Sequence, residues 1–120
     1  MKKLSVFLFF LWSGSVIFNA SRPSKLPELG IENLDKLIHF LYYIPGGFFC
    51  FLYLNRYEVR SKKLSFLLCI IISLVDEFIQ SFIPGRHSDI FDVFADSLGI
   101  ALGILLGSIR TKSENVKEKI

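Results

Sequence analysis

Four stretches of the sequence contain no Lys or Arg, and each is long enough to cross a lipid bilayer as a helix. They cover residues 4–20, 37–54, 64–83 and 90–109. A helix rises about 1.5 Å per residue and a hydrocarbon core is about 30 Å thick, so about 20 apolar residues span it. The sequence therefore predicts an all-α, polytopic membrane protein with four transmembrane helices, and it excludes a soluble catalytic domain.

The rest of the chain leaves no room for a second folded unit. The longest interruptions, residues 21–36 and 55–63, are too short to build a core of their own. We therefore expect a single four-helix membrane domain over residues 1–110. Residues 111–120 are polar and charged, and we expect them to form a frayed cytoplasmic tail.

The net charge of +3 arises from basic residues that sit in short groups beside the apolar stretches. This pattern indicates membrane topology and does not indicate nucleic-acid binding. With a cytoplasmic N-terminus, the inner segments carry ten of the 14 Lys and Arg, and the outer loops carry four. The positive-inside rule therefore predicts that both termini are cytoplasmic.

The first apolar stretch also has the basic start of a secretory signal, because Lys2 and Lys3 precede it. Cleavage after Ala20 would require a small residue at the position that Phe18 occupies. We therefore expect this stretch to be retained as a helix.

Two cysteines, Cys50 and Cys69, fall inside predicted spans, and their spacing matches neither a metal-binding motif nor a redox pair. We expect them to be packing residues. The sequence motifs predict no metal site and no cofactor.

The second span contains Pro45, Gly46 and Gly47 near its middle. Proline removes a backbone donor, so a kink or an unwound turn is expected. In a bilayer such a break must face protein or water. It is either a bend that fits neighbouring helices or a functional opening.

Small residues recur at every fourth position of the last span, at Ala95, Gly99, Gly103 and Gly107. Such a stripe allows two helices to approach closely in a membrane. We interpret it as a packing seam, either within the four-helix unit or in a homodimer.

Polar residues gather at one membrane face, because alternating spans place the start of the second, the end of the third and the start of the fourth on the same side. The candidate pocket residues are Asp35, His39, Asp76, Glu77, Gln80, Arg86, Asp92 and Asp96. Spacings of three and four put the members from each helix on one face of that helix. The three polar faces are therefore expected to converge.

Asp76 lies seven residues before the end of its span, about 10 Å of helix. A carboxylate at the bilayer centre costs about 2.5–3.5 kcal/mol, so such a group normally faces a protein interior. We expect Arg86, His39 or Lys36 to be its partner. The alternatives are a structural ion network and, for Asp89 and Asp92, a role at a helix N-terminus.

Several motifs stand in order along the chain: Asp35-Lys36-Leu37-Ile38-His39-Phe40 with Tyr43, Asp76-Glu77-Phe78-Ile79-Gln80, Arg86, and Asp92-Val93-Phe94-Ala95-Asp96 with Gly99 and Gly103. Together they resemble the VanZ-like family of small bacterial membrane proteins. The resemblance runs from the first span to the end of the fourth. The family pattern has Asn where this chain has Asp96. The resemblance implies a bacterial cytoplasmic membrane protein with a role in the cell envelope. The family is named for an accessory protein of resistance to the glycopeptide teicoplanin.

Three functions fit these residues. The preferred hypothesis is an outward-facing pocket in which Arg86 pairs with a phosphate or carboxylate of a lipid-linked glycan or an amphiphilic glycopeptide. The second is a hydrolase or transferase acting on a lipid phosphate, with His39, Asp76, Glu77 and Asp92 as general base or metal ligands. The third is a small proton-coupled transporter. Whether the protein is an enzyme is left open, and no catalytic residue is assigned.

Overall fold

The computed structural model describes residues 2–22, 34–55, 61–84 and 90–119. These residues form four helices, and the described part of the chain contains no strand. The helices are α1 (Lys2–Ala20), α2 (Leu34–Leu54), α3 (Ser61–Gln80) and α4 (Ile90–Lys119). The all-α architecture predicted from the apolar stretches is therefore confirmed.

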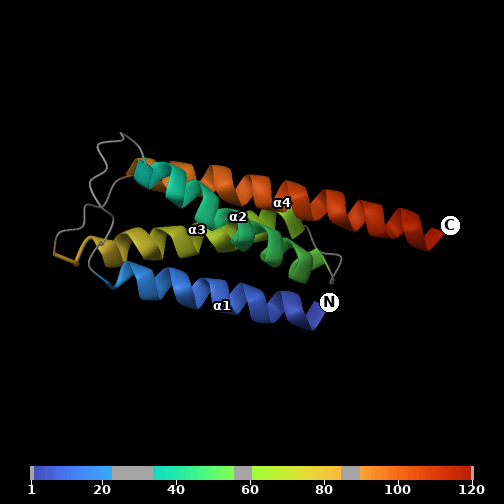
Figure 1. Ribbon diagram of the computed structural model, residues 1–120, viewed down its shortest axis with the longest axis horizontal. Coiled ribbons are helices and arrows are strands. Elements are labelled where there is room, and N and C mark those ends of the chain that lie inside the picture. Colours follow the sequence, from blue (N-terminus) through green and yellow to red (C-terminus); the bar gives the residue numbers. More distant parts are fainter. Residues whose placement is uncertain (1, 23–33, 56–60, 85–89, 120) are drawn as a thin grey trace.

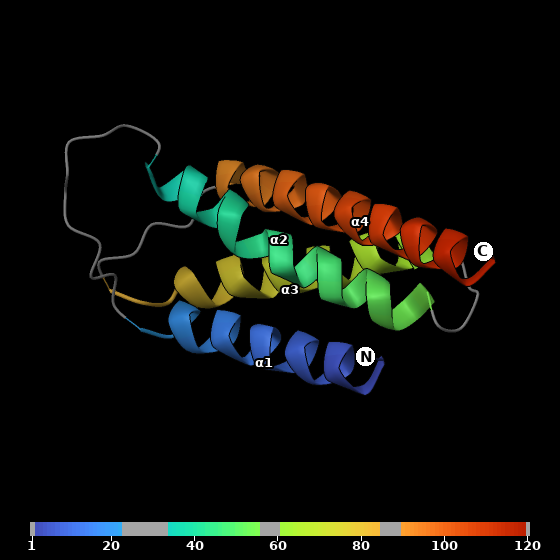
Figure 2. The same cartoon turned by 45° about the vertical axis from the view of Figure 1, so that its right-hand side comes forward.

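The helices run in alternating directions and form an elongated bundle of 54 × 24 × 21 Å (Figure 1). At one end of the bundle α1 begins and α4 ends, and we call this the terminal end. At the other end α2 and α4 begin and α1 and α3 finish, and we call this the site end. The view in Figure 2 shows the same alternation.

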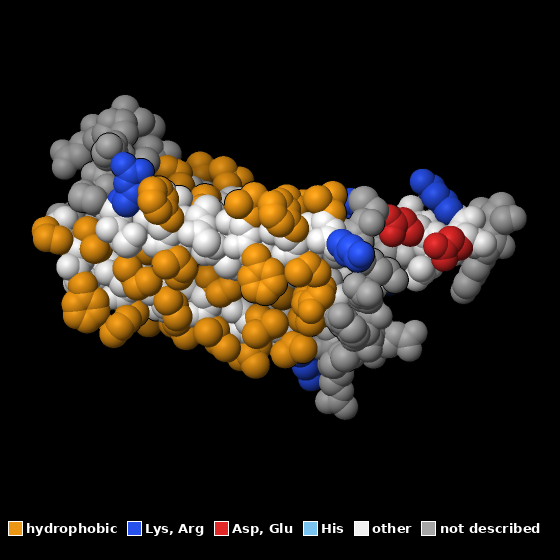
Figure 3. Space-filling model, turned by 90° about the horizontal axis from the view of Figure 1, so that it is seen from below, with side chains coloured by type: hydrophobic (Ala, Val, Ile, Leu, Met, Phe, Trp, Pro, Cys, Tyr) orange, Lys and Arg blue, Asp and Glu red, His pale blue; other side chains and the backbone are white. Residues whose placement is uncertain are grey.

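The bundle has the surface of a membrane protein. Helices α1, α2 and α4 are each long and apolar enough to cross a bilayer, over Lys3–Ala20, Lys36–Leu54 and Ile90–Glu118. Large apolar side chains are exposed on them, such as Phe7 at 61% and Phe94 at 68%. Apolar side chains cover much of the face in Figure 3. This exposure suits contact with lipid chains.

Helix α3 is the exception among the four, because it carries charged residues near both of its ends. Its pattern is the reverse of a soluble helix: the exposed side is apolar, with Leu67 55% and Phe78 66% exposed, whereas the buried side is polar or small. The buried residues of α3 are Ser61, Ser65, Cys69, Ser73, Asp76, Glu77 and Gln80. Polar side chains therefore face the inside of this bundle, as expected in a membrane.

Helices α1, α2 and α3 begin two or three residues before the predicted spans, and the C-terminal ends of two helices also differ from the prediction. Helix α3 ends at Gln80, three residues before the predicted end of the span, and the chain then turns ahead of Pro84, where proline disfavours helix in the preceding residue. Helix α4 continues through the predicted frayed tail to Lys119. The ion pair of Arg110 and Glu114, one turn apart at 3.2 Å, supports this extension.

Helix α4 packs most extensively against α2, and its glycines face that helix. A Cβ atom at Gly99 would overlap the carbonyl oxygen of Phe40, and one at Gly103 would overlap that of Ile44. Gly107 lies against the ring of Phe51. The stripe of small residues therefore forms a seam inside the chain. The homodimer contact stays a prediction.

Helix α2 is continuous through Pro45 and has no unwound turn among its described residues. The neighbouring glycines serve packing, because Gly46 lies against the indole of Trp12 and Gly47 against the backbone of Ile100. The expected unwound turn is therefore absent from α2, whereas the bend and the functional opening stay predictions.

The core joins all four helices around Trp12, Tyr43, Cys50, Cys69 and Ile100. Both cysteines are free thiols with 0% exposure. The Trp12 indole N–H donates to the backbone oxygen of Tyr42 at 2.9 Å, which attaches α1 to α2.

The seam predicts a strong position dependence for Gly→Ala substitutions. Gly103→Ala places a methyl group against the α2 backbone and is expected to destabilise the fold by about 1–3 kcal/mol. Gly14→Ala is the matched control, because nothing lies within 4 Å of a Cβ there. Thermal unfolding in detergent measures both. Equal melting temperatures for the two variants would contradict the seam.

Candidate functional site

The carboxyl group of Asp96 joins three helices at the site end of the bundle. One oxygen, Oδ1, lies 2.8 Å from His39 Nδ1 on α2. The other, Oδ2, accepts a hydrogen bond of 2.6 Å from the Ser73 hydroxyl on α3. Asp96 is 0% exposed, so these bonds replace the water that the carboxyl group would otherwise have.

A second buried carboxyl group, that of Asp76, lies beside the first. Its Oδ2 accepts from the Tyr43 hydroxyl at 2.8 Å, and its Oδ1 accepts from Gln80 Nε2 at 2.6 Å. The ring of Tyr43 is held in place by Trp12, which packs edge-on against it at 5.2 Å between centroids. Helix α1 therefore supports the site without contributing a ligand atom.

The accessible edge of the site is formed by Lys36, His39 and Asp92. Lys36 Nζ lies 3.5 Å from Asp92 Oδ1, and His39 Nε2 lies 3.8 Å from Asp92 Oδ2. The side chains of Lys36 and His39 are 27% and 15% exposed, against 5% for Asp92. Lys36 and His39 are therefore the partly exposed members of this group.

Four side chains form a set that suits a metal ion. His39, Asp76, Glu77 and Asp96 each offer one ligand atom, and these atoms all lie within 4.8 Å of one another. Imidazole and carboxylate ligands together suit Mn²⁺, Fe²⁺ or Zn²⁺. The same groups can also accept protons or bind hydroxyl and amino groups. No sequence motif gives this set, because its members come from three helices.

Helical spacing explains why the polar side chains of α2, α3 and α4 meet at the site end. His39 and Tyr43 are one turn apart on α2, and Ser73, Asp76 and Gln80 lie on the buried side of α3. Six of the eight pocket residues proposed from sequence lie at this end of the bundle: His39, Asp76, Glu77, Gln80, Asp92 and Asp96. Asp35 lies in the first turn of α2, but its side chain is outside the described residues, as is all of Arg86.

The expected partners of Asp76 have different outcomes. Among the described residues the hydrogen bonds of Asp76 come from Tyr43 and Gln80. Lys36 lies at Asp92 instead, because it is two turns nearer the start of α2 than Tyr43. His39 offers a nitrogen within 4.8 Å of an Asp76 oxygen, and Arg86, outside the described residues, stays a prediction.

Ser73 is the site residue that sequence reasoning missed. It belongs to the series Ser61, Ser65, Cys69 and Ser73, in which small residues recur every four positions on α3. This stripe points at Asp76 and Glu77, which follow at the next turn, and it resembles the glycine stripe of α4. It could have identified the buried face of α3.

Comparison with known proteins decides the family. The family model described as VanZ/LLP1 matches residues 2–111. The chain belongs to the VanZ/LLP1 family. The resemblance of the polar motifs is thereby confirmed, and it extends over nearly the whole chain.

One curated relative comes from fission yeast. The uncharacterized protein C11E3.10 of Schizosaccharomyces pombe is 31% identical over 87 residues, which is 72% of this chain and 54% of the yeast protein. The chain thus spans about half the length of this curated relative. No solved structure matches the chain.

The bridge through Asp96 predicts unequal effects for two serines on neighbouring helices. Ser73→Ala removes a donor to a buried carboxyl group and is expected to cost about 1–2 kcal/mol of stability. Ser97→Ala is the control, because this exposed hydroxyl bonds only its own helix and is expected to change stability by less than about 0.5 kcal/mol. Unfolding in mixed micelles measures the difference. A larger loss for the Ser97 variant would contradict the bridge.

Proposed function

We propose that this VanZ/LLP1 protein crosses the bacterial cytoplasmic membrane four times, with both termini in the cytoplasm. In this proposal α3 crosses the membrane in addition to α1, α2 and α4. The proposal is supported by the basic residues near the terminal end, which include Lys62, Lys63 and Lys112 on the described helices. In this orientation the site end faces outward.

We further propose that the site binds the headgroup of a lipid-linked envelope component, such as a lipid-linked glycan, or an amphiphilic glycopeptide. One observation carries the proposal: buried carboxyl groups lie among apolar helices, and their accessible edge is at Lys36 and His39, where α2 begins. A ligand that stays in the bilayer can place its polar part there while its lipid chain stays among other lipids.

The chemistry divides between the edge and the interior. Lys36 supplies a positive charge for a phosphate or carboxylate. Asp96, Asp76 and Glu77 accept hydrogen bonds from hydroxyl and amino groups of a glycan. Arg86 is outside the described residues and comes between α3 and α4 in the sequence; it is the second cation of this proposal. A contribution to teicoplanin-type tolerance follows if the bound component is a target of the glycopeptide.

The lipid-binding proposal is tested with an isosteric change. Asp76→Asn removes one charge and one acceptor from the site, and Glu114→Gln is the matched control on the exposed part of α4. Binding of undecaprenyl phosphate and of teicoplanin to the full chain in nanodiscs is measured. We expect Asp76→Asn to weaken one of them at least about tenfold, a loss of about 1.4 kcal/mol, and to reduce teicoplanin tolerance in cells.

Wild-type affinity for both ligands with Asp76→Asn would contradict this pocket, and so would equal losses for the two variants. Cells that lack the protein provide the reference for tolerance.

A second candidate function is hydrolysis or group transfer on a lipid phosphate with a divalent metal. The observation that favours it is the set of ligand atoms from His39, Asp76, Glu77 and Asp96 within 4.8 Å. Such an ion would polarise a phosphoryl oxygen. In this candidate the four side chains hold the ion, and Lys36 orients the phosphate.

Metal analysis separates the two functions. The full chain is dialysed against Mn²⁺ or Zn²⁺ and measured by elemental analysis, and phosphate release from undecaprenyl diphosphate is followed. The metal candidate predicts about one ion per chain and at least tenfold weaker binding with His39→Gln, because a ligand is lost. Glu114→Gln should retain the ion. No retained metal in the wild-type chain would eliminate this candidate.

A further inference from the structure

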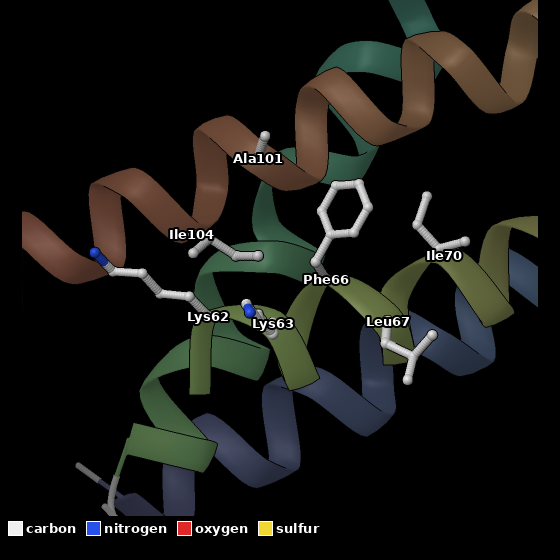
Figure 4. Close-up of a pocket in the computed structure, with 7 residues that line it drawn as sticks. All are labelled: Lys62, Lys63, Phe66, Leu67, Ile70, Ala101 and Ile104. Atoms are coloured by element: carbon white, nitrogen blue, oxygen red, sulfur yellow. The ribbon is translucent and has the colours of Figure 1, made fainter. Parts of the chain in front are cut away.

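An apolar hollow lies between α3 and α4, on the side of the polar site that faces the terminal end of the bundle. Its volume is about 620 Å³, and it is lined by Lys62, Lys63, Phe66, Leu67, Ile70, Ala101 and Ile104. Figure 4 shows apolar side chains of α3 beneath Ala101 and Ile104 of α4, with both lysines at one end. The hollow is therefore greasy along its length and positively charged at one end.

A second hollow continues from the charged end and shares both lysines with the first. Its volume is about 580 Å³, and its lining is mostly polar: Phe51, Asn55, Ser61, Lys62, Lys63, Ser108, Thr111, Lys112 and Asn115. The two hollows thus meet at Lys62 and Lys63, and we call them together the groove, with an apolar part and a polar part.

The charge in the groove has one sign. Lys62, Lys63 and Lys112 line it, and none of its lining residues in the described part of the chain is acidic. The nearest acidic residue along α4, Glu114, pairs with Arg110 at 3.2 Å. A partner of this groove must therefore carry negative charge beside an apolar body.

The dimensions and position suit a lipid. Lys62 and Ile70 are eight residues apart on α3, so the apolar part runs about 12 Å along the helix axis, the length of a large part of an acyl chain. Basic grooves between helices at the edge of the apolar region bind anionic lipid headgroups.

We propose that this groove binds an anionic phospholipid of the leaflet at the terminal end. One acyl chain lies along Phe66, Ile70 and Ala101, and the phosphate lies at Lys62 and Lys63. The polar part of the headgroup occupies the second hollow, where Ser108, Lys112 and Asn115 offer donors. The site is separate from the carboxyl cluster, so the proposal does not depend on what that cluster binds.

The test measures lipid selectivity of the full chain. The protein in detergent is titrated with dioleoyl phosphatidylglycerol or dioleoyl phosphatidylcholine, and native mass spectrometry gives the affinity for the first bound lipid. We expect a preference of about tenfold or more for phosphatidylglycerol, since each lysine near an anionic headgroup adds about fivefold. Lys62→Gln with Lys63→Gln should abolish the preference.

The matched control is Lys3→Gln with Lys117→Gln, which changes the net charge equally at two exposed positions outside the groove. It should keep the preference. Equal affinity of the wild-type chain for the two lipids would overturn the proposal, and so would equal loss in the two double variants.

A second pair of variants tests the apolar part. Ala101→Phe fills the hollow and should weaken phosphatidylglycerol binding several-fold, whereas Leu105→Phe, on an exposed position outside the lining, should not. Unchanged binding in Ala101→Phe would overturn the placement of the acyl chain. Correct folding of each variant is checked by its melting temperature.

Discussion

The hydrogen bonds of Asp96 are the interaction on which the site end of the bundle depends. This carboxyl group is fully buried, and it is bonded to His39 of α2 and Ser73 of α3. In a membrane the surroundings offer no water to replace a lost partner, so an unbonded carboxyl group would be costly. The three helices are therefore held at one distance from each other, and the other polar residues take their places from that arrangement.

The glycine seam sets the distance at which those hydrogen bonds can form. Gly99 follows one turn after Asp96 and lies against the backbone of Phe40. An ideal Cβ atom at Gly99 would lie 3.3 Å from the Cβ of Tyr43. A larger residue would push α4 away from α2, and with it Asp96 away from His39. The hydrogen bonds of the polar site therefore depend on close packing along the seam. α1 completes it, because Trp12 packs on Tyr43, which in turn bonds Asp76.

The sequence predicted the helices well because long apolar stretches allow few other structures in a membrane. It predicted the polar faces because spacings of three and four are a property of any helix, and Gln80 and Asp76 are indeed bonded one turn apart. Pairings between helices were harder. Charge alone suggested Lys36 as one partner of Asp76, whereas helix rotation and depth bring Tyr43 and Gln80 to it and leave Lys36 at Asp92. The role of Ser73 also depends on which side of α3 is buried, and apolar composition alone does not determine that side.

The two ends of the bundle have opposite chemistry. At the site end, buried carboxyl groups lie close together and are hydrogen-bonded to a histidine and to neutral side chains. Near the terminal end, lysines line a groove that continues into an apolar hollow. Exposed apolar side chains lie on the helices between the two ends. This VanZ/LLP1 chain thus carries an acidic interior and a basic groove on one bundle.

The most direct test of the hydrogen bond between α2 and α4 is a double-mutant cycle of His39 and Asp96. The stabilities of wild type, His39→Gln, Asp96→Asn and the double variant are compared by unfolding in mixed micelles. The account predicts a coupling free energy of about 1.5–3 kcal/mol, as expected for a buried hydrogen bond that involves a charged group. A coupling near zero would show that the two side chains do not interact across α2 and α4, and it would contradict the structure of the site.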